Sequence, residues 1–209
     1  MRVHYSISSS YLYPMKISVV GTGYVGLVTG TCFAETGNHV ICVDIDAAKV
    51  SRMQAGEIPI YEPGLETLFH RNIKQGNLEF TTDLKAAVEQ TDIVFLALPT
   101  PPNEDGSADL KYVLKVAEDL GGIINGYNIF IDKSAVPVGT ADLVRERIAA
   151  TCKHEFDVVS NPEFLREGMA VEDFMKPERV VIGTESEKAK DMLNRLYAPF
   201  VRQGNPIIF

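Results

Sequence analysis

Three glycines spaced as G-x-G-x-x-G form the most informative candidate site in the sequence. They are Gly21, Gly23 and Gly26, and they directly follow a short apolar run. Gly21 would allow a tight turn, Gly23 would let the backbone approach a pyrophosphate, and Gly26 would let a helix pack closely on the preceding strand. The amino terminus of that helix offers unpaired N–H groups to phosphates. The spacing therefore predicts a dinucleotide-binding turn.

Asp44 is the acidic residue that such a turn requires. It follows the glycines by about 20 residues, at the end of a second apolar run over residues 39–44. A carboxylate there accepts hydrogen bonds from the hydroxyls of an adenosine ribose and repels a 2′-phosphate, which favours NAD over NADP. The alternative is a plain glycine turn with Asp44 as a helix cap, and FAD would fit the same turn.

The elements around this motif alternate between short apolar runs, typical of buried strands, and helical patterns. Apolar strands that alternate with helices form parallel sheets covered on each side. The sequence thus predicts a Rossmann-like α/β fold, with a doubly wound, mostly parallel sheet and helices on both faces. We expect strands at residues 16–20, 39–44, 78–81, 92–98, 128–132, 156–160 and 179–183, helices at 24–36, 65–75 and 186–197, and the start of another strand in 204–209.

Composition excludes several classes of protein. The 209 residues are 45% hydrophobic and 23% charged, as in soluble globular proteins. A net charge of −8 gives no basic excess for nucleic acid or an anionic membrane, and no apolar run is long enough to span one. Cys32, Cys42 and Cys152 form no C-x-x-C pair, so we interpret them as reduced structural thiols, which suggests the cytoplasm.

The first fourteen residues differ from the rest. Residues 1–14 lack the compact apolar stretch of a signal peptide, and the strand pattern starts after Pro14. We expect residues 1–14 to be a disordered or non-native extension, such as a tag remnant or a misplaced start, and residues 15–209 to be the domain. An edge strand at residues 11–13 is the alternative.

Five separated motifs resemble the UDP-glucose/GDP-mannose dehydrogenase family, and the resemblance covers residues 15–209. Members of that family oxidise the C6 hydroxymethyl of a nucleotide sugar to a carboxylate with two NAD, through a cysteine thioester. The resemblance implies that this chain ends before the family's central helix and sugar-binding domain, so that it lacks the thioester cysteine. The motifs are GTGYVGLVTG at 21–30, PIYEPGL at 59–65, ALPTPP at 97–102, KSAVPVGT at 133–140 and SNPEFLREG at 160–168.

The resemblance also assigns residues to the cofactor. The glycine turn would line the pyrophosphate, Asp44 and Lys49 would lie at the adenosine ribose, and Thr100 follows a strand at its carboxyl end, where sheets of this class bind ligands. Glu167 would lie close to the nicotinamide. The implied NAD-binding residues are Gly21, Gly23, Tyr24, Val25, Gly26, Asp44, Lys49, Thr100, Ala135 and Glu167.

Glu163 is the expected catalytic residue of the chain. The resemblance implies that it acts as general base on water during thioester hydrolysis, which requires hydrogen-bond reach to that water. Ordinary surface charge is the alternative for both glutamates, and without the motif it would be favoured for Glu167. The segment expected to contact the nucleotide sugar consists of Glu163, Phe164, Leu165, Arg166 and Glu167.

Ala135 departs from the family pattern. The family usually has threonine at this position, in K-S-T-V-P, and its hydroxyl would help to position water and touch the cofactor. A lost hydrogen bond of this kind typically costs about 0.5–1.5 kcal/mol. The sequence is compatible with reduced activity or with a tolerated or engineered change.

Within the family, the sequence leaves the sugar substrate and the functional class open. The ALPTPP and EGMAVEDF stretches look most like the UDP-glucose branch, with GDP-mannose or UDP-N-acetylmannosamine as the alternative substrate. A free-standing NAD-binding module without catalysis is the alternative from another functional class. The resemblance implies a homodimer for the full-length protein. His70 and His154 lack the spacing of metal ligands, so we expect no metal.

Overall fold

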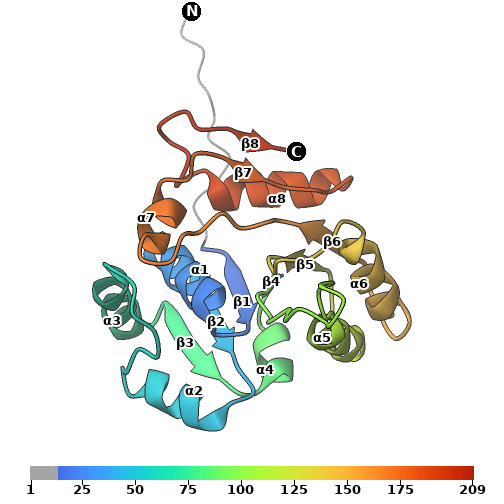
Figure 1. The fold of residues 1–209 in the computed structure, drawn as a ribbon, viewed down its shortest axis with the longest axis horizontal. Coiled ribbons are helices and arrows are strands. Elements are labelled where there is room, and N and C mark those ends of the chain that lie inside the picture. Colours follow the sequence, from blue (N-terminus) through green and yellow to red (C-terminus); the bar gives the residue numbers. More distant parts are fainter. Residues whose placement is uncertain (1–13) are drawn as a thin grey trace, which may run out of the picture.

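The computed structural model describes residues 14–209, and its centre is a six-stranded parallel sheet (Figure 1). The strand order is β3-β2-β1-β4-β5-β6, so the chain reverses its direction of winding between β1 and β4. The predicted doubly wound parallel sheet is therefore confirmed. The strands are β1 (Lys16–Val20), β2 (His39–Val43), β3 (Leu78–Thr81), β4 (Ile93–Leu96), β5 (Asn128–Asp132) and β6 (Phe156–Ser160).

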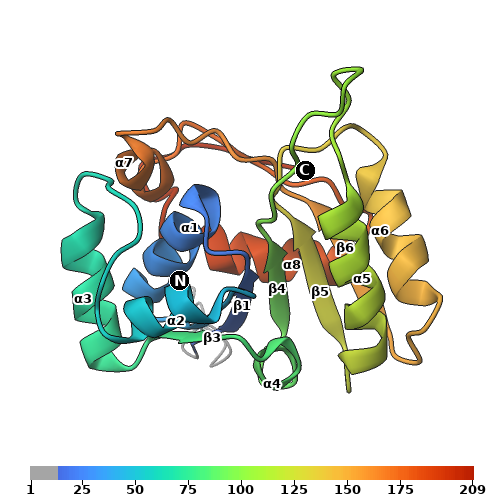
Figure 2. The ribbon, with the colours of Figure 1, turned by 60° about the horizontal axis from the view of Figure 1, so that its bottom comes forward.

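Helices cover both faces of this sheet. Figure 2 shows α5 and α6 on one side of the strands and α1 and α3 on the other. Each face has its own apolar cluster, because consecutive strand residues point to opposite faces. The helices are α1 (Tyr24–Glu35), α2 (Ala47–Gln54), α3 (Leu65–Gln75), α4 (Leu84–Val88), α5 (Lys111–Ile123), α6 (Thr140–Ala149), α7 (Ala170–Met175) and α8 (Glu187–Tyr197).

The predicted strand at residues 179–183 needs a correction. Only Val180–Val181 is a strand, β7, and it pairs in parallel with β8 (Ile207–Ile208) in a separate two-stranded sheet. Ser160 and Gly183 exchange backbone hydrogen bonds of 3.0 and 2.7 Å, which is the isolated bridge between the end of β6 and this segment. The pattern identified an extended segment correctly but placed it in the wrong sheet.

The last third of the chain packs into the same core as the first. The ring centroid of Phe33 in α1 lies 5.1 Å from that of Phe95 in β4, 5.1 Å from that of Phe174 in α7 and 5.4 Å from that of Tyr197 in α8. Aromatic pairs at such distances stabilise a core beyond their buried area. The segment after β6 is therefore part of the domain and is held against α1.

Residues 1–13, which include the possible edge strand at 11–13, lie outside the described residues. Among the helices that are described, none is both long and apolar enough to cross a membrane.

Candidate functional site

A cavity of about 770 Å³ lies over the carboxyl ends of the central strands. Its walls come from the turn after β1 and from the ends of β2, β4 and β5, which is the place where open parallel sheets bind ligands. We call it the first cavity. It is lined by most of the residues expected to bind the cofactor, namely Gly21, Gly23, Tyr24, Val25, Asp44, Lys49, Thr100 and Ala135.

The three glycines have different surroundings in the turn. Gly21 has φ +98°, and a Cβ there would lie 2.3 Å from the carbonyl oxygen of Ala97. A Cβ on Gly26 would lie 1.9 Å from the carbonyl oxygen of Gly21, whereas one on Gly23 would meet no atom within 4 Å. Gly21 and Gly26 thus allow close backbone packing, and Gly23 leaves open space in the first cavity. Gly26 does not itself line that cavity.

Asp44 lines the first cavity, and its carboxylate accepts several hydrogen bonds from neighbouring residues. Its Oδ2 accepts hydrogen bonds from the Thr22 N–H at 3.1 Å, from the Thr22 hydroxyl and from Lys49 Nζ at 2.9 Å. Its Oδ1 accepts the Asp46 N–H at 3.1 Å. Burial would raise the pKa of Asp44, but these hydrogen bonds lower it to about 2. The carboxylate is therefore ionised at neutral pH.

Thr22 and Ser134 were not predicted from the sequence as site residues, although both line the first cavity. Thr22 is fully buried and fixes Asp44. The Ser134 hydroxyl accepts the Leu98 N–H at 3.0 Å and joins the ends of β4 and β5. The signal for Thr22 was present in the sequence, because a hydroxyl between the first two glycines can reach the end of the neighbouring strand.

Ala135 lies exposed on the wall of the first cavity, at the position where the resemblance implies threonine. Its carbonyl oxygen accepts a 3.0 Å hydrogen bond from the Thr100 hydroxyl. Thr100 is therefore oriented by the backbone of the next loop. The structure gives no explanation for the replacement of the threonine side chain.

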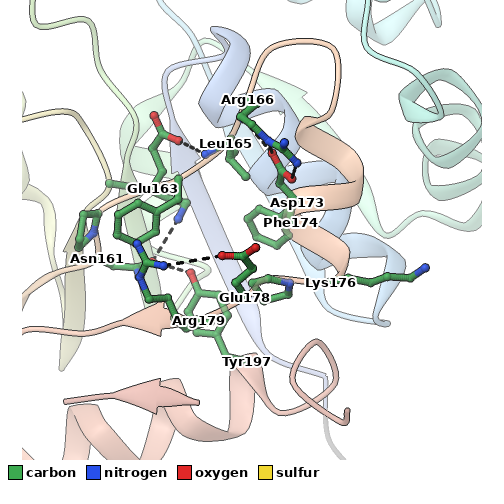
Figure 3. Close-up of a pocket in the computed structure, with 15 residues that line it drawn as sticks. Asn161, Glu163, Leu165, Arg166, Asp173, Phe174, Lys176, Glu178, Arg179 and Tyr197 are labelled. Carbon is green, nitrogen blue, oxygen red and sulfur yellow. Dashed lines mark hydrogen bonds and ion pairs between the residues drawn. The ribbon is translucent and has the colours of Figure 1, made fainter. Parts of the chain in front are cut away.

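A second cavity of about 320 Å³ adjoins the segment after β6 (Figure 3). Glu163, Phe164, Leu165 and Arg166 line it, whereas Glu167 lines neither cavity and its placement near the nicotinamide stays a prediction. Glu163 lines both cavities. The structure therefore places the expected general base at the boundary between them.

The Glu163 carboxylate is held by its own segment. Its Oε2 accepts the Leu165 N–H at 2.6 Å, and the side chain is half-buried. Arg166 is held separately, because its N–H and its guanidinium both donate to Asp173 at 2.6–3.0 Å. These bonds give the segment a defined conformation along the wall in Figure 3.

Lys133 and Arg179 were not predicted as site residues and add positive charge to the second cavity. Burial lowers the pKa of Lys133 to about 8, and the charge of Glu163 opposes that shift. The Lys133 Nζ donates to Asn161 Oδ1 at 3.3 Å. The guanidinium of Arg179 lies 4.6 Å from the Phe164 ring centroid, within the range of cation–π contacts. Lys133 belongs to the KSAVPVGT motif, whereas Arg179 lies outside the five motifs.

The cysteines lie apart from both cavities. Cys32 and Cys42 are fully buried, and burial raises the pKa of Cys42 to about 12 and that of Cys32 still further. Cys152 is half-buried and lines neither cavity. Within residues 14–209, no three His, Cys, Asp or Glu side chains are grouped so that they could hold a metal ion.

Comparison with known proteins settles the family. The sequence model of the UDP-glucose/GDP-mannose dehydrogenase family, NAD binding domain, matches residues 15–201. The chain belongs to this family. Its glycine turn fits NAD, because the close packing at Gly21 and Gly26 brings backbone to the wall of the first cavity and Gly23 leaves room there.

Relatives and solved structures agree with this membership. A UDP-glucose 6-dehydrogenase of Bacillus subtilis is 50% identical over 88% of this chain and 41% of its own length. The structure of a UDP-glucose dehydrogenase from Pyrobaculum islandicum matches with a TM-score of 0.89 and 41% identity, over 94% of this chain and 46% of that one. A GDP-mannose dehydrogenase from Pseudomonas aeruginosa gives a TM-score of 0.87 and 35% identity, over 93% and 46%. The chain thus spans less than half the length of these relatives.

Proposed function

We propose that the complete protein oxidises the C6 hydroxymethyl of UDP-glucose to the carboxylate of UDP-glucuronate, and that this chain is its NAD-binding half. The observation that carries the proposal is the position of Glu163. It lies in the wall of the cavity that holds the glycine turn and also in the wall of the adjoining cavity. A carboxylate there can act on a substrate beside the cofactor.

The residues of the first cavity would bind and orient NAD, which supplies the hydride acceptor when bound. The turn at Gly21 and Gly23 would take the pyrophosphate at the amino terminus of α1. Asp44 and Lys49 would bind the adenosine ribose, and the ionised Asp44 would repel a 2′-phosphate. Thr100 and Ala135 would lie at the opposite end of the cofactor.

Glu163 would act as general base on water. The Leu165 N–H engages Oε2, which leaves Oε1 as the oxygen that would take the proton. Glu163 is within electrostatic range of the buried Lys133 ammonium, because the charge of Glu163 raises the pKa of Lys133. The segment from Glu163 to Glu167 would contact the nucleotide sugar.

The thioester cysteine of this reaction would come from outside the chain. Cys32 and Cys42 are buried with raised pKa values, and a thiol in that state is a poor nucleophile. Cys152 lines neither cavity. We therefore expect this chain alone to bind NAD without turnover.

UDP-glucose is the preferred sugar because of the identities above. Among the solved structures, the Pyrobaculum islandicum UDP-glucose dehydrogenase is 41% identical to this chain, against 35% for the GDP-mannose dehydrogenase. We further propose a homodimer for the complete protein, on the basis of the family resemblance. The free thiols of Cys32 and Cys42 are consistent with our proposal of a cytoplasmic location.

Calorimetry with NAD and NADP, together with an assay of NAD reduction by the complete protein, tests this proposal. This chain should bind NAD in preference to NADP, and Asp44→Ala should weaken NAD binding by more than about tenfold, because bonds to charged groups contribute about 1.5–3 kcal/mol. Asp191→Ala is the matched control, since Asp191 is exposed on α8 and lines neither cavity. The complete protein should reduce two NAD for each UDP-glucose. Turnover with GDP-mannose or UDP-N-acetylmannosamine but not UDP-glucose would overturn the substrate assignment.

A further inference from the structure

Glu62 is a buried carboxylate with no role in the function proposed above. It lies in the loop between α2 and α3, within the PIYEPGL motif, and only 6% of its surface is exposed. A buried charge is costly unless hydrogen bonds satisfy it. The burial of Glu62 therefore has to be explained by the hydrogen bonds that its carboxylate accepts.

Both oxygens of Glu62 accept backbone hydrogen bonds from the far end of the chain. Oε1 accepts the Gly168 N–H at 2.8 Å, and Oε2 accepts the Ala170 N–H at 3.3 Å. The partners are separated from Glu62 by 106 and 108 residues. One side chain thus joins the loop before α3 to the backbone that leads into α7.

The backbone held by Glu62 continues directly into the segment that carries Glu163. Gly168 has φ +83°, a conformation that favours glycine, and it ends this segment. At the other end, Glu163 is bonded to the Leu165 N–H. A fixed Gly168 therefore restricts the positions that Leu165 and the Glu163 carboxylate can take.

Tyr24 connects this arrangement to the cofactor turn. Burial, and after it the charges of Glu62, Glu163 and Glu167, raise the pKa of the Tyr24 phenol well above its ordinary value. Tyr24 also lines the first cavity. Glu62 is therefore within electrostatic range of the boundary at which the two cavities meet, although it lines neither of them.

We propose that Glu62 is a positioning residue, whose carboxylate holds the backbone at Gly168 and Ala170 so that Glu163 keeps its place between the two cavities. The part concerning catalysis rests on the proposed function, because it requires Glu163 to be the base. A simpler role, in which Glu62 only caps α7, would stabilise the fold without a specific effect on Glu163.

Residue-resolved amide exchange of this chain by NMR distinguishes the two roles. In Glu62→Ala, the amides of Gly168 and Ala170 should lose protection, and so should that of Leu165, which Glu62 does not contact. Glu62→Gln keeps one acceptor oxygen and should show a smaller loss at the same amides. Unchanged protection at Leu165 in Glu62→Ala would overturn the positioning role. Glu66→Gln is the control, because Glu66 is exposed in the first turn of α3.

Kinetics of the complete protein test the catalytic consequence. Glu62→Ala should lower kcat with UDP-glucose by about tenfold to a hundredfold, the cost of small displacements at an active site, while the Kd for NAD stays unchanged. If Glu62→Ala also weakened NAD binding and lowered the thermal stability together with kcat, the role of Glu62 would be structural instead. A wild-type protein inactive on UDP-glucose would contradict the proposed function, whereas the exchange result would still decide whether Glu62 positions the segment.

Discussion

At the scale of single residues, the cofactor site depends on how Asp44 is held. Three donors from Thr22 and Lys49 converge on Oδ2, and the Asp46 N–H occupies Oδ1. A carboxylate fixed in this way keeps both its charge and its direction. Selectivity between NAD and NADP should therefore depend on Thr22 as well as on Asp44.

Replacement of Thr22 by valine tests this dependence. Thr22→Val keeps the shape of the side chain but removes the hydroxyl bond to Asp44, so NAD affinity should fall about tenfold, since a hydrogen bond to a charged group contributes about 1.5 kcal/mol or more. Calorimetry with NAD measures the change. Thr67→Val, at an exposed position on α3, should leave the Kd unaltered. An unaltered Kd in Thr22→Val would mean that Lys49 and the backbone suffice.

The sequence could predict that Asp44 and Lys49 lie at the same end of the site, but not the hydrogen bonds that fix Asp44. The spacing between glycines and acid follows from the geometry of a strand, a turn and a helix, which recurs whenever such a turn binds a dinucleotide. The contacts of Thr22, Lys133 and Glu62 depend on how distant segments meet. Glu62 is the clearest case, because its partners are more than a hundred residues away.

At the scale of elements, the glycines around the turn between β1 and α1 have two different roles. Some allow close packing of α1 on neighbouring backbone and side chains, and one leaves open space in the first cavity. Gly26 lies against the carbonyl of Gly21, and Gly30 brings α1 close to the Cys42 sulfur of β2. Gly23, in contrast, has φ −68°, which any residue can adopt. Substitution by alanine should therefore reduce mainly fold stability at Gly26 and mainly NAD affinity at Gly23.

Gly26→Ala and Gly23→Ala form a matched pair. Gly26→Ala should destabilise the fold by about 1–3 kcal/mol, because its methyl group would overlap the Gly21 carbonyl. Gly23→Ala should lose less than about 1 kcal/mol, the cost of a poorer helix cap, yet bind NAD more weakly. Urea denaturation and calorimetry measure the two quantities. Equal stability losses in both variants would contradict this division of roles.

Patterns of apolar residues predicted the strands of the main sheet well and the last strands less well. The runs at β3, β5 and β6 have the expected bounds, although only the central strand β5 is buried along its whole length and the edge strands β3 and β6 are partly exposed. The predicted strand at residues 92–98 is shorter in the structure, Ile93–Leu96, since the chain turns into the cavity wall at Ala97. The pairing of β7 with β8 could not be predicted, because an apolar run does not specify its partner.

At the scale of the whole molecule, buried charge makes stability depend on pH. Asp132, at the end of β5, is 2% exposed, and its Oδ2 has no hydrogen-bond partner among the described residues. Burial raises the pKa of Asp132 to about 6, although the Ser134 N–H opposes this shift. The native state therefore favours the protonated acid. The stability that this preference contributes is complete below the unfolded pKa and is lost as the pH rises through about 6.

Asp132→Asn isolates that contribution. The amide stays neutral, so the variant should gain stability relative to wild type as the pH rises from about 4 to about 6, by a few kcal/mol at most, since one pKa unit corresponds to about 1.36 kcal/mol. Urea denaturation across this range measures the difference. Asp191→Asn, at an exposed position, should follow the wild-type curve. A constant difference between Asp132→Asn and wild type would show that folding does not shift the pKa of Asp132.

The position of Glu163 in two cavity walls has a thermodynamic consequence. Under the proposed function, NAD in one cavity and the nucleotide sugar in the other would meet the same carboxylate, so their binding free energies would be coupled. Linkage requires the coupling to be reciprocal: the factor by which a nucleotide sugar changes the affinity for NAD equals the factor by which NAD changes the affinity for the sugar. Glu163→Gln keeps the shape but removes the charge, and any change in that common factor gives the electrostatic share of the coupling.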